Sequence, residues 1–82
     1  MIELRYFAWV RERIGTSQER LETTAPTVAA LVAELKTRSD GHAAAFADIR
    51  ALRVALDQEL ADFDAPLAGV REVAFFPPMT GG

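Results

Sequence analysis

The sequence predicts an α+β domain in which one main helix packs on one face of a mixed sheet. Two observations predict this class: apolar residues alternate near both ends of the chain, and one strongly amphipathic helical segment follows residue 26. The strand segments do not alternate strictly with helices, which favours α+β over a parallel α/β sheet. With 82 residues, the chain has room for one domain and one core.

The first expected strand spans residues 2–7. Its period of two indicates a strand with one buried face. One face carries Ile2, Leu4 and Tyr6, and the other carries Glu3, Arg5 and Phe7. Phe7 is therefore an aromatic side chain on the face that should be polar.

The main helix is expected to begin after Pro26-Thr27. The Thr27 hydroxyl is a suitable N-cap because it can accept a hydrogen bond from an amide of the first turn. An apolar stripe with helical spacing follows, consisting of Val28, Leu31, Val32 and Leu35. Residues 39–41 (Ser-Asp-Gly) are expected to end the helix.

The other expected elements are short. They are a helical turn at residues 8–14 capped by Gly15, a weaker strand at 17–23, a second short helix within 42–50, strands at 52–56 and around 59–61, and a last strand from about 72 to 76. Pro77-Pro78 cannot donate ladder hydrogen bonds, so the sheet should end there. By pattern analogy, this element order is that of the β-grasp, or ubiquitin-like, fold.

Composition excludes several classes of function. Because the chain has no cysteine, it has no disulfide framework, thiolate metal site or cysteine nucleophile. A formal charge of −3 and a pI near 5.0 argue against binding to nucleic acid or to an anionic membrane surface. The N-terminus lacks the unbroken apolar stretch of a secretory signal, and no segment reaches the ~20 apolar residues of a membrane span. We therefore expect a soluble, cytoplasmic protein.

No catalytic constellation is evident within the body of the chain. The one histidine, His42, is expected to be a solvent-exposed residue near a helix start, because a lone histidine cannot form a ligand set. Ser17 and Ser39 are expected in turns or caps. The acidic residues Asp57, Glu59, Asp62 and Asp64 lack the spacing of a calcium loop and are expected to be solvated. The sequence thus predicts neither a metal site nor a bound cofactor.

The C-terminus offers a different chemistry. Gly81 and Gly82 have no side chains to pack and are entropically costly to order. We expect a β-grasp domain over residues 1–78 and a flexible tail over 79–82. The six residues from Pro77 to Gly82 can reach ~20 Å when extended, enough to thread into a narrow cleft. A disordered terminus is the alternative interpretation. The α-carboxylate of Gly82 would need activation, for instance as an acyl-adenylate, before it could react.

An apolar surface is expected near the base of this tail. Phe7 and Phe76 both alternate with the core-facing residues of their strands, so both should point away from the core. They form one patch if those strands are neighbours. Exposed aromatic clusters tend to mark interfaces. Pro77, Pro78 and Arg11 are assigned to the same predicted partner interface, although arginines on such a turn are more often simply solvated. A bulge or a two-sided sheet would instead bury the rings.

Residues 72–82 (EVAFFPPMTGG) resemble the ending of the molybdopterin synthase small subunits, the MoaD family. Residues 6–12, 26–28 and 63–67 are also similar to that family, so the resemblance covers the whole chain. The ending with two phenylalanines and two prolines is fairly specific, whereas a terminal Gly-Gly alone also occurs in ubiquitin-like modifiers and thiamine sulfur carriers. Residues 68–71 (Ala-Gly-Val-Arg) depart from the family's acidic turn.

The resemblance implies a cycle with two partners. An activating enzyme would adenylate Gly82 with ATP, and sulfur would replace one oxygen to give a thiocarboxylate. The tail, with Met79, Thr80 and Gly81, would then enter the active site of the large synthase subunit, in a heterotetramer. There the sulfur would pass to the pyranopterin precursor in molybdenum cofactor biosynthesis. This chain would be the small subunit of a sulfurtransferase complex, without catalytic side chains or a bound cofactor of its own.

Three alternatives remain open from the sequence. The chain could carry sulfur for another pathway of the thiamine type. It could also be a non-catalytic β-grasp interaction module whose tail is incidental, or a protein modifier joined to lysines. These hypotheses differ in the partner that they require and in whether the terminal glycines are essential.

Overall fold

The structure, a computed structural model, describes residues 1–78; the predicted tail residues Met79, Thr80, Gly81 and Gly82 lie outside the described residues. The elements in chain order are β1 (Ile2–Tyr6), α1 (Ala8–Ile14), β2 (Gln18–Leu21), α2 (Val28–Leu35), α3 (Asp40–Ala45), the 3₁₀ helix η1 (Ile49–Ala51), β3 (Arg53–Leu56), β4 (Glu59–Ala61) and β5 (Glu72–Phe76). No helix in residues 1–78 is long and apolar enough to cross a membrane.

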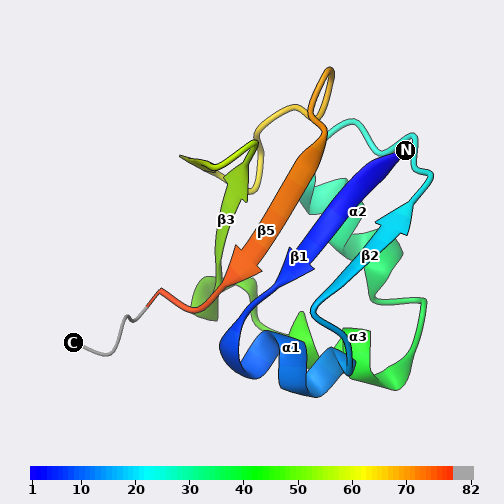
Figure 1. The fold of residues 1–82 in the computed structure, drawn as a ribbon, viewed down its shortest axis with the longest axis vertical. Coiled ribbons are helices and arrows are strands. Elements are labelled where there is room, and N and C mark those ends of the chain that lie inside the picture. The colour runs from blue at the N-terminus through cyan, green and yellow to red at the C-terminus, as the bar shows by residue number, and fades with distance from the viewer. Residues whose placement is uncertain (79–82) are drawn as a thin grey trace.

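The five strands form one mixed sheet in the order β2-β1-β5-β3-β4. The central strands β1 and β5 are parallel, and the other neighbours are antiparallel. Helix α2 lies behind the sheet, while α1 and α3 lie at the end where β1 and β5 finish (Figure 1). The predicted α+β class, a mixed sheet with one main helix on one face, is confirmed.

Helix α2 forms as its sequence predicts. The Thr27 hydroxyl accepts a hydrogen bond from the amide of Ala30 at 3.2 Å, which satisfies one of the free donors of the first turn. The four residues of the predicted stripe are all buried: Val28, Leu31, Val32 and Leu35. The helix therefore packs one continuous apolar face against the sheet.

The segment after α2 differs from the prediction. The helix ends at Leu35, four residues before the expected stop, and Ser39 begins the next helix instead of ending the previous one. The Ser39 hydroxyl accepts a hydrogen bond from the amide of His42 at 3.1 Å. The predicted single helix within 42–50 is two elements, because the Asp48 carboxylate accepts from the amide of Arg50 and starts a separate 3₁₀ turn.

Helix α1 is short but well fixed at its end. Gly15 follows it with a φ of 97°, a left-handed conformation that favours glycine, as the sequence predicts. Trp9 is half-buried and packs against the core, with the Arg13 guanidinium 4.5 Å from its ring. Helix α3 approaches α1 closely, because a Cβ atom at Gly41 would collide with the carbonyl oxygen of Arg13. These two helices pack at one end of the sheet.

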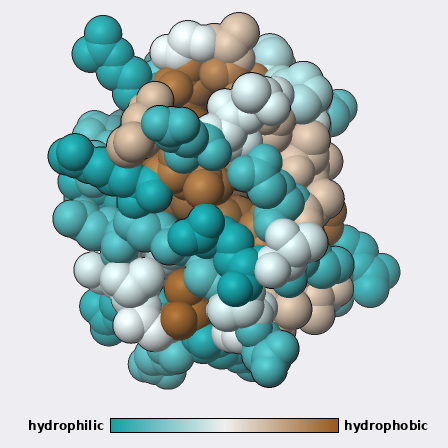
Figure 2. Space-filling view, turned by 90° about the vertical axis from the view of Figure 1, so that its right-hand side faces the viewer, coloured by the Kyte–Doolittle hydropathy of each residue, from teal (hydrophilic) through white to brown (hydrophobic). Residues whose placement is uncertain are grey.

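The core lies between the sheet and the helices. Fully buried side chains from both layers include Tyr6, Phe46 and Phe75, whose rings contact one another with centroids 4.8–6.4 Å apart. Figure 2 views the molecule from the β2 side and shows apolar atoms recessed between hydrophilic side chains. Hydrophilic side chains thus make up most of the surface on this side of the molecule.

Candidate functional site

The two aromatic residues predicted to form a patch lie at the ends of the two central strands. Phe76 is the last residue of β5, whereas β1 ends at Tyr6, one residue earlier than expected, and Phe7 is the N-cap residue of α1. Strands β1 and β5 are neighbours (Figure 1), and the amide of Phe7 donates to the carbonyl of Phe75 at 3.2 Å. The strands that lead to Phe7 and Phe76 are therefore neighbours, as a shared apolar patch requires. Phe7 is 47% exposed and Phe76 is half-buried, so neither ring belongs to the fully buried core.

A third large apolar side chain, Leu60, lies on the outer face of the sheet. It is 75% exposed and pairs with Ala55, which in turn pairs with Ala74. The two alanines are nearly covered and too small to project, so they form a low floor between the larger side chains. We call this set of residues the docking surface: Phe7, Ala55, Leu60, Ala74 and Phe76. Exposed apolar groups gathered in this way mark an interaction site.

The docking surface lies where the chain leaves the sheet. Strand β5 ends at Phe76, and Pro77 and Pro78 follow without amide hydrogens to continue the ladder. Pro77 is half-buried and Pro78 is exposed. Any partner that covers Phe76 therefore also meets the start of the segment that leads to Gly82.

Charged residues flank the docking surface. The Arg5 guanidinium lies 3.3 Å from the Glu3 carboxylate and 3.7 Å from the Glu72 carboxylate. Arg11 is exposed on α1, and no ion pair of it is found within residues 1–78. The basic group expected from the sequence at this interface is thus accessible, whereas Arg5 is already neutralised.

The turn between β3 and β4 fixes the start of β5. Asp57 and Gln58 both have positive φ, 50° and 72°, as a tight two-residue hairpin turn requires. One Asp57 oxygen accepts hydrogen bonds from the amides of Arg71 and Glu72, at 3.1 and 3.0 Å. Asp57 is therefore not merely a solvated acid. It holds the beginning of β5 despite the unusual segment at 68–71.

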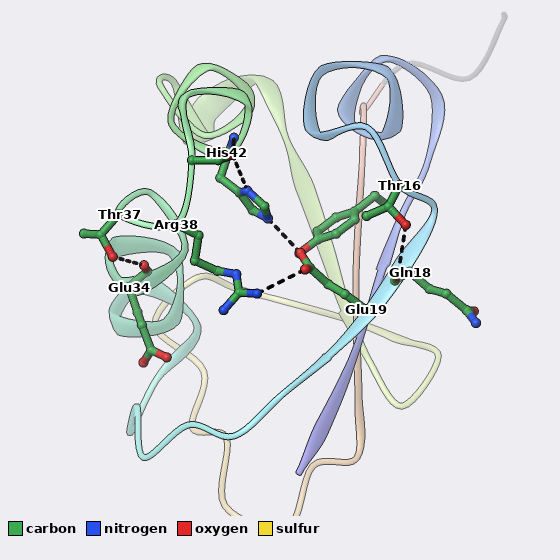
Figure 3. A network of polar contacts seen from close by, with 9 residues as sticks. Thr16, Gln18, Glu19, Glu34, Thr37, Arg38 and His42 are labelled. Carbon is green, nitrogen blue, oxygen red and sulfur yellow. Dashed lines mark hydrogen bonds and ion pairs between the residues drawn. The ribbon is translucent and has the colours of Figure 1, made fainter.

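His42 contradicts the expectation of an exposed residue. Its side chain is buried, with 7% of the residue exposed, and it joins a polar network between α3 and the sheet (Figure 3). Its Nε2 lies 2.7 Å from a Glu19 carboxylate oxygen, and its Nδ1 lies 2.7 Å from the Ser39 hydroxyl. The Tyr6 hydroxyl donates to the same Glu19 oxygen at 2.7 Å. The prediction was wrong because Glu19, its partner, lies 23 residues away in the sequence.

This network keeps Glu19 ionised. Burial on its own would raise the pKa of Glu19, but hydrogen bonds from His42 and Tyr6 and the nearby charge of Arg38 outweigh it and hold that pKa below its usual value. Burial, followed by the hydrogen bond to Glu19, raises the pKa of Tyr6. The Ser39 hydroxyl is engaged as a helix cap. The network ties β1, β2 and α3 together and has the character of a structural cluster.

The described part of the chain contains no group of three histidine, cysteine, aspartate or glutamate residues placed to hold a metal ion.

Two features of the structure were not predicted from the sequence. Leu60 lies in a strand of three residues, too short to show a period, and its exposure becomes visible only through its pairing with Ala55. The His42–Glu19 contact depends on tertiary packing. The candidate site is therefore the exposed apolar surface at the root of the C-terminal segment.

Comparison with known proteins gives consistent results. The sequence profile of the ThiS family matches residues 4–82. The chain is 45% identical to the molybdopterin synthase sulfur carrier subunit of Escherichia coli (strain K12) and 35% identical to that of Haemophilus influenzae, in each case over 100% of both chains.

Solved structures support the fold. SAMP1 from Haloferax volcanii superposes with a TM-score of 0.76 at 24% identity, covering 99% of this chain and 98% of that one. A putative molybdopterin converting factor, subunit 1, from Pyrococcus furiosus gives a TM-score of 0.72 at 22% identity, covering 95% and 97%. At these identities, the likeness concerns the fold alone, and that fold is the ubiquitin-like β-grasp.

Proposed function

This chain belongs to the ThiS family, and from that premise we propose that it is the sulfur carrier subunit of a molybdopterin synthase. The observation that carries the proposal is the position of the docking surface at the end of β5, directly before the segment that leads to Gly81 and Gly82. The full-length similarity to two molybdopterin synthase sulfur carrier subunits supports the choice of pathway.

The chemistry is that of the terminal carboxylate. ATP converts the Gly82 carboxylate to an acyl-adenylate with release of pyrophosphate, and an incoming sulfide (HS⁻) displaces AMP to leave a thiocarboxylate. That sulfur then passes to the pyranopterin precursor during molybdenum cofactor biosynthesis. The side chains of this chain bind partners and present the tail, while acid and base groups come from the partners.

Two partners follow from this chemistry. The activating enzyme must hold Gly82 beside ATP, and the large synthase subunit must hold it beside the precursor. Both reach the tail across its base, where Phe76 and Pro77 lie, so both are expected to use the docking surface and to exclude each other. In the assembled synthase, we propose two copies of this chain and two large subunits.

The proposal is tested by the mass of the protein after incubation with ATP, a sulfur donor and the activating enzyme. The expected product is heavier by the replacement of one oxygen by sulfur, and fragmentation places the change at Gly82. A chain lacking Gly82 is the control and should remain unmodified. Modification elsewhere in the chain, or none in the presence of an active enzyme, would contradict the proposal.

A carrier of the thiamine type is the alternative, because the ThiS family profile matches the chain. The two functions differ in the partner that covers the docking surface. Co-purification with a molybdopterin synthase large subunit supports the first function. Co-purification with a thiazole-forming enzyme, and not with the synthase subunit, would support the alternative.

A further inference from the structure

A charged residue, Arg53, borders the docking surface. Arg53 is exposed, lies on β3, and is paired in register with Phe76 of the neighbouring strand β5. Its neighbours in sequence, Leu52 and Val54, point into the core, so Arg53 projects from the outer face. Paired residues on adjacent strands are about 5 Å apart. A partner that covers Phe76 therefore also covers Arg53.

The charge of Arg53 is not balanced by a carboxylate of the described chain. Arg5, Arg38 and Arg50 each lie within 4.0 Å of an acidic oxygen, at Glu3, Glu19 and Asp48 respectively. For Arg53, the contact found within residues 1–78 is a hydrogen bond from Nη1 to the Leu52 carbonyl at 3.1 Å. A guanidinium has five N–H donors, so most of them face solvent in the free protein.

A shallow hollow lies beside Arg53 and could receive a side chain of a partner. It has a volume of about 300 Å³ and is lined by Arg53, Leu60, Ala61 and Asp62. Continuing the β3–β4 register places Asp62 opposite Arg53, yet the two are not within ion-pair distance. The hollow is continuous with the docking surface through Leu60. The hollow therefore offers an apolar wall from Leu60 and Ala61 and an open guanidinium from Arg53, with the Asp62 carboxylate at its rim.

We propose that Arg53 is a partner-recognition residue, and that the large subunit places a carboxylate side chain in this hollow against its guanidinium. Covering Phe76 removes water from Arg53, and a charge without a counter-ion is unfavourable in such a setting. The planar guanidinium of an arginine pairs well with a carboxylate, which can accept two hydrogen bonds from it. This inference rests on the proposed function, since it assumes that the large subunit covers the docking surface.

The test measures the affinity of the full chain for the large subunit by calorimetry, with variants Arg53→Glu, Arg20→Glu and Phe76→Ala. Arg53→Glu should weaken binding at least about 30-fold, because it sets two carboxylates against each other. Arg20→Glu makes the same charge change on the far edge strand β2, where Arg20 is exposed and pairs with Glu3, and should change affinity less than about threefold. Reversing the charge of the facing acidic residue in the large subunit should restore binding to the Arg53→Glu chain.

The variants separate failure of this inference from failure of the proposed function. If Phe76→Ala weakens binding but Arg53→Glu acts no more strongly than Arg20→Glu, the role of Arg53 is overturned. If no acidic position of the large subunit rescues Arg53→Glu on charge reversal, the carboxylate contact is overturned. If the unmodified chain does not bind the large subunit, the proposed function itself fails. Unfolding curves of each variant confirm that the folded chain is being measured.

Discussion

At the scale of single residues, His42 links helix α3 to Glu19 of strand β2 through a set of hydrogen bonds. The Ser39 hydroxyl accepts from the His42 amide and can still donate its own proton to His42 Nδ1. In the tautomer that carries the proton on Nε2, the ring donates to Glu19. Every polar atom of this buried cluster has a partner, which is the condition under which such a network stabilises a fold.

Removing the histidine side chain should destabilise the protein. His42→Ala removes the ring that joins the Glu19 carboxylate to the Ser39 hydroxyl, although Glu19 keeps its contacts with Tyr6 and Arg38. Because only 7% of His42 is exposed, we expect a loss of about 1–3 kcal/mol in the free energy of unfolding. Urea denaturation measures it. Gln18→Ala, at an exposed position of the same strand as Glu19, is the control and should change stability little. Equal stability of the two variants would show that the network contributes nothing.

The lowered pKa of Glu19 predicts a pH dependence. A carboxyl group whose pKa is lower in the folded state than in the unfolded chain, where it is near 4.5, stabilises the fold above that value. This contribution is lost as the pH falls below about 4.5 and through the folded-state pKa. The free energy of unfolding should therefore fall more steeply below pH 4.5 for the natural chain than for Glu19→Gln. Parallel curves would contradict the assignment.

At the level of elements, predictability follows the length and regularity of the local pattern. Helix α2 combines a threonine cap with four stripe residues, so its start and its buried face are readable from sequence. Ser39 is ambiguous, because Ser-Asp-Gly can end one helix or cap the next, and only packing against α1 decides it. Leu60 belongs to a strand too short for a period. The terminal glycines, by contrast, are visible in the sequence alone.

The close contact between α1 and α3 predicts that adding one methyl group at Gly41 destabilises the protein. Gly41→Ala places a Cβ against the backbone carbonyl of Arg13, and a backbone atom cannot move aside as the end of a side chain can. We expect a loss of about 1–3 kcal/mol in the free energy of unfolding, measured by denaturation. Ala44→Ser, at an exposed position of the same helix, is the matched control. A Gly41→Ala protein as stable as that control would show that the two helices can separate freely.

On the scale of the whole molecule, the core and the proposed docking surface lie on opposite faces of the sheet. The inward face packs on α2 and forms the core, while the outward face carries Phe7, Leu60 and Phe76 near the point where the chain leaves β5. An exposed side chain on the outward face, such as Leu60, can therefore be changed at little cost to folding. This separation makes the docking surface open to direct test by substitution.

Leu60→Ser tests this separation. Because Leu60 is 75% exposed, the substitution should change the free energy of unfolding by less than about 0.5 kcal/mol. Binding to the large subunit and to the activating enzyme should each weaken by about 1–2 kcal/mol, since an exposed leucine is fully buried only in a complex. Thermal unfolding and calorimetry measure the two effects. A variant that loses stability but keeps both affinities would place Leu60 in the fold and not at the interface.

The central claim is that sulfur travels on Gly82 into the site of a second subunit. It is tested most directly by a single-turnover reaction of the thiocarboxylated chain with the large subunit and the pyranopterin precursor. The account predicts that each sulfur gained by the precursor is matched by one chain returning from thiocarboxylate to carboxylate, and that a chain without Gly82 transfers none. Sulfur incorporation that leaves the thiocarboxylate intact, or that proceeds equally well without Gly82, would contradict it.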